Sequence, residues 1–394
     1  MAARAPAALT VPVSARPGSL RPASHFDGHR RPIGIAVLAR PLLAAAVLLL
    51  LLAAVLGGLV RAGVLVLRPD DPAALGNAAA LHAALMLSGF FGTTLAIERA
   101  VTSGRLWAFS APLAAAASGL LLLLGARGAG AGLGCVAAAL LAAVSVQMLM
   151  AQRIAQRALL LVGALAWLAG QAVFLDAGNA GLAVPFWFAF VVLTLTAQRI
   201  EVAGSVHSHP LARPVLALVA LVLLAGAGLS VVAPGPGGVV FAAALAALAL
   251  WSSRFDSARR MVAIGGLSRY VGVCVLAGYG WLGLSGVAWA SAALGGPGRD
   301  IALHALGLGF VMNLVMAHAP IIVPTALRIK LKFGPGFYLA VLLIQVSLLL
   351  RLDGGTLHPA LFVTAAALNA CSLGVFGLTL AGSALARRRL GARK

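Results

Sequence analysis

Histidines within long apolar segments are the residues of this sequence best suited to chemistry. His304 and His318 both lie in segment 300–324, DIALHALGLGFVMNLVMAHAPIIVP. Hydrocarbon solvates imidazole poorly, so an ionisable side chain inside such a segment indicates a functional site. At about 100° and 1.5 Å per residue, a regular helix would place both side chains near one face, roughly 21 Å apart. Pro320 and Pro324 predict a kink or an end of this helix.

His82 is a further imidazole in an apolar segment, 77–97, and its surroundings resemble those of His304. Each histidine is the centre of an LHA tripeptide, and a GF pair follows a few residues later. Haem iron takes axial nitrogen ligands, and two facing helices can supply one histidine each. We therefore predict that His82 and His304 bind haem b. A structural histidine that hydrogen-bonds a carbonyl group is the alternative for either residue.

His318 is the third candidate metal ligand. A second haem would need a histidine fourteen residues after His82, but Ala96 stands there, so the sequence does not favour two haems. A metal site formed by His318 with the loop residues His207 and His209 is the other interpretation. Copper lacks support, because no adjacent histidine pair occurs in the middle segments.

The elements that must position these residues are membrane-spanning helices. The chain has 394 residues, of which 62% are hydrophobic and 10% are charged, and no soluble globular domain has this composition. Segments of about 20 apolar residues are long enough to cross a bilayer as helices. Twelve are expected, which predicts an all-α polytopic membrane protein: 40–62, 77–97, 107–126, 131–150, 158–176, 183–200, 212–233, 237–253, 270–292, 300–324, 335–352 and 359–385.

Basic residues predict the orientation of these twelve helices. With the N-terminus in the cytoplasm, nearly all of the 29 Lys and Arg fall on the cytoplasmic side. The exceptions are Arg61, Arg68, Arg127, Arg299 and Arg351. Cytoplasmic loops carry such an excess, so we predict a bacterial inner-membrane protein with both termini in the cytoplasm. His82 and His304 would then share a depth near the outer side, where Arg299 and Arg351 could hold the haem propionates.

Three regions follow from this division of the chain. Residues 1–36 form a basic tail, 37–386 the membrane domain, and 387–394 a short basic tail.

The net charge of +20 lies in short loops, which favours contact with the lipid bilayer and gives no indication of nucleic-acid binding. All nine acidic residues lie in tails, loops or segment ends, which argues against a proton- or sodium-coupled transporter. Two acidic and basic clusters, 98–99 and 198–201, are expected to form ion pairs.

Four stretches carry a resemblance to a known family: HAALMLSGFFGTTLAIER from His82, LTLTAQRIE near residue 200, AGYGWL from Ala277, and HALGLGFVMNLVMAHAPIIVP from His304. Together they resemble a group of bacterial membrane proteins related to the NnrS proteins and, more distantly, to subunit I of the haem-copper oxidases. The likeness covers most of residues 40–385. It implies a twelve-helix haem-copper-oxidase-like bundle, a role in redox chemistry or nitric oxide tolerance, and His82 and His304 as ligands of a low-spin haem.

Two functional hypotheses remain open from the sequence. The first is a haem b protein with a redox or nitric-oxide-related role and an electron-transfer or small-molecule partner of unknown identity. The second is a transporter or channel-like bundle whose histidines are structural. The sequence leaves open whether the chain is an enzyme, because no catalytic acid–base constellation, phosphate-binding loop or nucleophile motif is present.

Overall fold

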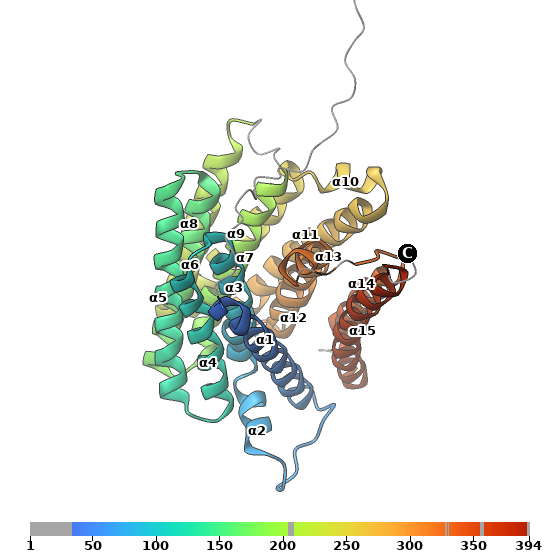
Figure 1. Cartoon of the computed structure of the whole chain (residues 1–394). Coiled ribbons are helices and arrows are strands. Elements are labelled where there is room, and N and C mark those ends of the chain that lie inside the picture. Colours follow the sequence, from blue (N-terminus) through green and yellow to red (C-terminus); the bar gives the residue numbers. More distant parts are fainter. Residues whose placement is uncertain (1–33, 204–208, 328, 330, 355–357, 392–394) are drawn as a thin grey trace, which may run out of the picture.

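The computed structural model describes residues 34–203, 209–327, 329, 331–354 and 358–391. The elements formed by these residues are all helices, and no β-strand occurs among them. Most of the helices are long and form one bundle (Figure 1). The short helix α2 (Ala73–Ala80) lies at one end of the bundle and α10 (Ala258–Ile264) at the other, so we call these the α2 end and the α10 end. The predicted N-terminal tail lies almost entirely outside the described residues.

The long helices follow the apolar runs of the sequence, and glycines in left-handed conformation end two of them. Gly104 (φ 66°) follows α3 and Gly178 (φ 62°) follows α6, positions that favour a residue without Cβ. The remaining elements are α1 (Gly34–Arg61), the π-helix η1 (Ala84–Gly92), α3 (Thr93–Ser103), the 3₁₀ turn η2 (Leu106–Phe109), α4 (Ser110–Leu123), α5 (Arg127–Ala151), α6 (Ala155–Ala177), α7 (Ala180–Ala203), α8 (Ala212–Val232), α9 (Pro234–Phe255), α11 (Gly266–Ala293), α12 (Arg299–His304), the π-helix η4 (Ala305–Met312), α13 (Asn313–Leu327), α14 (Gly336–Gly354) and α15 (Pro359–Gly391).

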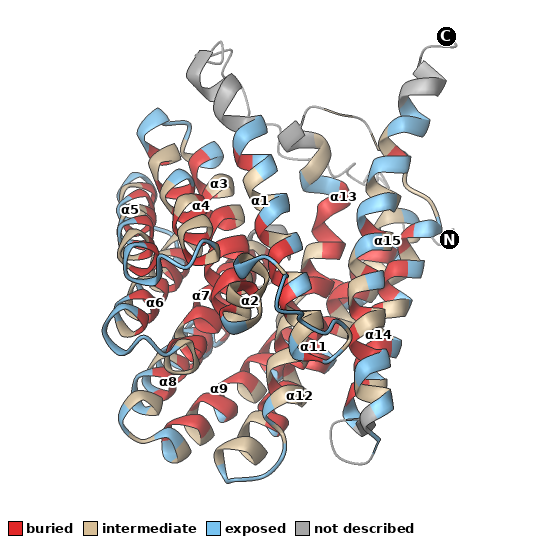
Figure 2. Cartoon of the chain, turned by 90° about the horizontal axis from the view of Figure 1, so that it is seen from below, coloured by how far each residue is buried: buried red, intermediate tan, exposed pale blue. Residues whose placement is uncertain are grey.

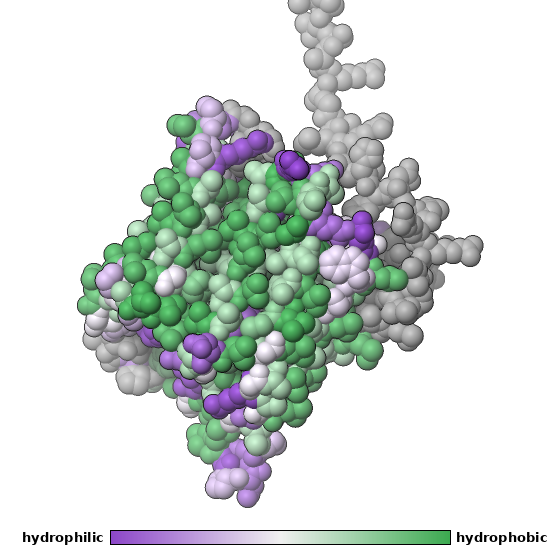
Figure 3. Space-filling view, turned by 90° about the vertical axis from the view of Figure 1, so that its left-hand side faces the viewer, coloured by the Kyte–Doolittle hydropathy of each residue, from purple (hydrophilic) through white to green (hydrophobic). Residues whose placement is uncertain are grey.

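These helices confirm a multi-span membrane protein. Among the described residues, 11 helices are long and apolar enough to cross a bilayer, and a further apolar helix, Gly336–Leu352, is shorter. Together they correspond in order to the twelve predicted segments. The surface seen in Figure 3 is mostly hydrophobic, and its hydrophilic residues gather toward the α2 and α10 ends. Such an apolar belt suits contact with lipid.

The core of the bundle is built around α7. Its span Ala180–Ile200 is 83% buried, whereas Pro41–Arg61 of α1 is 28% buried and faces outward. Viewed from the α2 end, buried residues line the inward faces of the helices and exposed residues lie outside (Figure 2). Helices α14 and α15 pack mainly against each other and meet the rest of the bundle through α1, α12 and η4.

Both histidine-bearing spans contain a π-helical segment directly after the histidine, which the sequence did not predict. His82 follows a break at Leu81 that ends α2, and η1 begins two residues later; η4 begins immediately after His304. A glycine in each span packs against an indole ring: a Cβ on Gly92 would collide with Trp167, and one on Gly309 with Trp281. Segments of π-helix are rare and are common at functional sites.

The π-helix η4 overturns the expectation that His304 and His318 share a face of one regular helix. The wider turn changes the angle between residues before and after it. His318 consequently contacts Arg199 of α7, whereas His304 contacts Arg351 of α14. Of the predicted kink or end at Pro320 and Pro324, the end is contradicted, because α13 continues through both prolines to Leu327, and the kink stays a prediction.

The predicted orientation can be tested by cysteine labelling in intact cells. In a background without Cys135, Cys274 and Cys371, we expect a membrane-impermeant maleimide to label Asp70→Cys, which lies beside α2. It should label Arg259→Cys in α10 only after the cells are permeabilised, because the basic residues gather at that end. Labelling of Arg259→Cys in intact cells would show that the orientation is the opposite of the predicted one.

Candidate functional site

A cavity of about 140 Å³ lies where the α14–α15 pair meets α1, η1, α7 and the α12–η4 span. His82 and His304 both line the cavity, so the structure brings together the two histidines that the sequence paired. The other lining residues are mostly apolar: Leu51, Val55, Gly58, Leu59, Ala83, Met86, Leu87, Phe91, Phe188, Leu303, Gly307, Leu308, Met312, Arg351, Ala366, Asn369, Ala370 and Leu373.

His82 is held by a hydrogen bond to the backbone of α1. Its Nδ1 lies 2.7 Å from the carbonyl oxygen of Ala54, and because a carbonyl group can only accept, Nδ1 carries the proton. The Nε2 atom then keeps its lone pair and has no partner among the described residues. Gly58, one turn after Ala54, leaves the space that the ring occupies, since a Cβ there would lie 2.9 Å from its Cε1 atom.

His304 has the same tautomer, set by its own helix. Its Nδ1 donates to the carbonyl oxygen of Asp300 at 2.9 Å and lies 3.2 Å from the Asp300 carboxylate. On the other side of the ring, Nε2 accepts a hydrogen bond from Nη2 of Arg351 at 3.3 Å. His82 and His304 therefore each have Nδ1 bound to a backbone carbonyl group and a lone pair on Nε2.

Arg351 is the charged group of the cavity, and Asp300 neutralises it. Its Nε donates to one carboxylate oxygen at 2.6 Å and its Nη2 to the other at 3.2 Å. The guanidinium also lies over the ring of Phe362, 4.7 Å from its centroid. A guanidinium stays protonated at any physiological pH, so this buried cation needs the carboxylate.

The donor set of the cavity fits a haem better than a bare metal ion. No group of three or more His, Cys, Asp or Glu side chains that could hold an ion occurs among the described residues. Two imidazoles from separate spans in an apolar cavity are a donor set that haem iron accepts. Arg351 could pair with a propionate, whereas Arg299 lines a different cavity and is not available for this contact.

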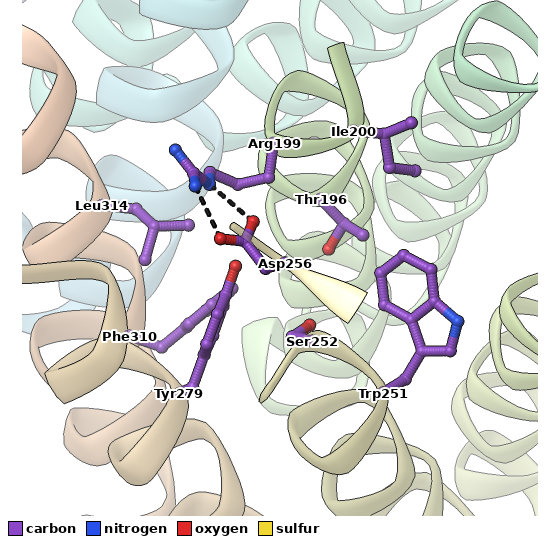
Figure 4. Close-up of a pocket in the computed structure, with 9 residues that line it drawn as sticks. All are labelled: Thr196, Arg199, Ile200, Trp251, Ser252, Asp256, Tyr279, Phe310 and Leu314. Carbon is purple, nitrogen blue, oxygen red and sulfur yellow. Dashed lines mark hydrogen bonds and ion pairs between the residues drawn. The ribbon is translucent and has the colours of Figure 1, made fainter. Parts of the chain in front are cut away.

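A second polar cluster lies closer to the α10 end and contains His318. Arg199 of α7 donates from Nε and Nη2 to the two carboxylate oxygens of Asp256, at 3.0 and 2.7 Å (Figure 4). The hydroxyl group of Tyr279 points toward this ion pair (Figure 4). His318 lies 3.4 Å from Nη1 of Arg199 and donates from Nδ1 to the carbonyl oxygen of Leu314. His318 therefore belongs to this cluster and does not line the His82–His304 cavity.

Apart from Arg199, the remaining predicted residues lie outside both sites. The two acidic and basic clusters meet, since Gln198 donates to Glu98 at 2.5 Å and Glu98 pairs with Arg99. His209 packs against Phe255, and His207 lies outside the described residues. Sequence reasoning missed the roles of Gly58, Asp300 and Asn369 in the cavity. Of these three residues, only Asp300 could have been found from the sequence, because it precedes His304 by one helical turn.

The chain belongs to the family described as a domain of unknown function (DUF8744), whose family model matches residues 40–385. No curated protein and no solved structure matches the chain. The family match covers every span of the bundle and both polar sites. It carries no link to the NnrS proteins or the haem-copper oxidases, so that resemblance stays a prediction.

Loss of the Asp300 carboxylate should destabilise the protein. We expect Asp300→Asn to lower the free energy of unfolding by about 1–3 kcal/mol, because Arg351 would keep its charge without a counterion. Asp300 is partly exposed, which moderates the effect. The measurement is the melting temperature in detergent micelles, with Asp176→Asn, an exposed acid on α6, as the control. Equal melting temperatures for Asp300→Asn and the wild type would contradict this role.

Proposed function

We propose that this DUF8744 protein binds haem b between His82 and His304 and transfers electrons within the membrane. The observation that carries the proposal is the pair of imidazoles, on separate spans, that line one apolar cavity with the same Nδ1–carbonyl hydrogen bond. Histidines that bind metals usually donate their other N–H to a carbonyl or carboxylate group, which fixes the tautomer and the ring orientation.

The residues around the iron site would determine what the haem does. Bound haem would supply one-electron chemistry. His82 and His304 would both hold the haem, which favours electron transfer over gas binding. Arg351 would orient His304, because its Nη2 lies 3.3 Å from Nε2 of that ring.

Arg351 would have a second task in the same site. Its guanidinium is the cation of the cavity, and bidentate pairing with a carboxylate is its preferred geometry. A haem propionate would share this cation with Asp300, whose carboxylate remains partly exposed. The finer topology belongs to the same proposal: twelve spans in the bacterial inner membrane, with the α2 end outside and both termini in the cytoplasm.

A transporter or channel-like protein with structural histidines is the second candidate. It is favoured by the hydrogen bonds of His304, whose two ring nitrogens both have protein partners. In that case the cavity would hold part of a transported small molecule or lipid. The two candidates differ in the absorption spectrum of the purified protein.

The spectrum of the protein purified from haem-supplemented cells tests the proposal. We expect a Soret band in the wild type and a loss of about tenfold or more in His82→Ala and in His304→Ala, because each removes an axial ligand. His318→Ala is the control, since it removes a buried imidazole outside the cavity, and it should keep the band. A colourless wild type of native fold would favour the second candidate.

Gly58 gives an independent test that leaves both histidines in place. We expect Gly58→Leu to reduce haem per protein, because the new side chain would occupy the position of the His82 ring. Gly76→Leu is the matched control, since its Cβ would meet no atom within 4 Å. Haem content is measured as pyridine haemochromogen per protein. Equal haem in the two variants would show that the position of His82 does not matter for binding.

A further inference from the structure

A second cavity, of about 560 Å³, lies at the α2 end between α7, α8, α9, α11 and α12. Arg299 is the cation that lines it, beside Asn179 and Trp289. No acidic side chain is among the described residues that line this cavity. Ser230 is a further polar residue of the lining, and the other walls are apolar or formed by glycine and proline, so the cavity combines one positive charge with both polar and apolar surface.

Arg299 differs from the two other arginines described above because its side chain is exposed and has no partner among the described residues. Arg199 and Arg351 are both buried and each pairs with a carboxylate. Arg299 makes no ion pair or hydrogen bond with any described residue, and its neighbour Asp300 is bound to Arg351. Its guanidinium therefore presents its N–H donors to whatever fills the cavity.

Two further N–H groups in the cavity have no acceptor. The Oδ1 atom of Asn179 accepts from the backbone N–H of Gly181 at 2.8 Å, which leaves its amide NH₂ as a donor. Trp289 packs against Phe241 and Phe188, and its indole N–H has no acceptor among the described residues. The lining thus offers donors and one cation, which suits an anion with several oxygen atoms.

The rim of the cavity points to an anion that carries apolar chains. Val232, two residues before the lining residue Pro234, is 80% exposed. Leu294, between the lining residues Ala293 and Gly295, is 77% exposed. On a membrane protein such exposed apolar side chains face lipid. A ligand that places its oxygens near Arg299 and its chains beside Val232 and Leu294 would satisfy both surfaces.

We propose that the Arg299 cavity binds the phosphodiester headgroup of an anionic phospholipid. Phosphatidylglycerol has the required chemistry, because it has one phosphate charge, further hydroxyl groups and no ammonium group. Phosphatidylcholine adds a cation, for which the described lining residues offer no carboxylate. The proposal does not depend on haem, since the histidines line the other cavity.

The test measures lipid binding to the full chain in detergent by native mass spectrometry and by thermal shift. We expect phosphatidylglycerol to bind the wild type, and Arg299→Gln to weaken binding about tenfold, as for the loss of one charged hydrogen-bonding group. Arg299→Lys should restore part of the affinity. Arg127→Gln, which removes an exposed cation at the same end, is the control and should bind as the wild type does.

Three outcomes would overturn the proposal. They are equal binding of phosphatidylglycerol to Arg299→Gln and the wild type, an equal loss of binding in Arg127→Gln, and equal binding of phosphatidylcholine. Inorganic phosphate provides a further arm. If phosphate alone stabilised the wild type as much as the lipid does, and Arg299→Gln abolished this effect, the site would take a free anion and the lipid assignment would be wrong.

Discussion

The ion pair between Asp300 and Arg351 is the interaction on which the histidine cavity depends. A permanently charged guanidinium buried inside a membrane bundle needs a counterion, because removing a charge from water is costly unless the charge is paired. The Asp300 carboxylate meets this need through two hydrogen bonds and also lies 3.2 Å from the proton-bearing nitrogen of His304. One carboxylate thus joins α12 to α14 and helps to orient the imidazole. Arg199 and Asp256 repeat the arrangement closer to the α10 end.

Much of this architecture follows from the sequence by simple physical rules. A bilayer fixes the length of a spanning helix, so apolar runs of about 20 residues locate the spans with little ambiguity. The depth of a side chain in the bilayer then follows from counting residues from the end of its span. That reasoning was enough to pair His82 with His304, which line one cavity in the structure. It also predicted an ion pair in the cluster 98–99, which Glu98 and Arg99 form, whereas Arg199 of the second cluster pairs with Asp256.

The rest of the site could not be read from the sequence, because it depends on local departures from α-helical geometry and on contacts between distant segments. Nothing in ALGLGFVM shows that these residues form a π-helix, yet η4 changes the direction in which His318 points. In the fold, Asn313 donates to the carbonyl oxygen of Gly309, within η4, at 2.6 Å. Arg199 pairs with Asp256, a loop residue 57 positions later in the chain. Hydropathy patterns contain no information on such pairings.

Leu303 lines both cavities, so a single side chain forms part of the partition between an apolar compartment with two imidazoles and an open compartment with a free cation. It is also the residue before His304. A molecule bound against Leu303 in either cavity would therefore contact the residue that directly precedes one of the two imidazoles.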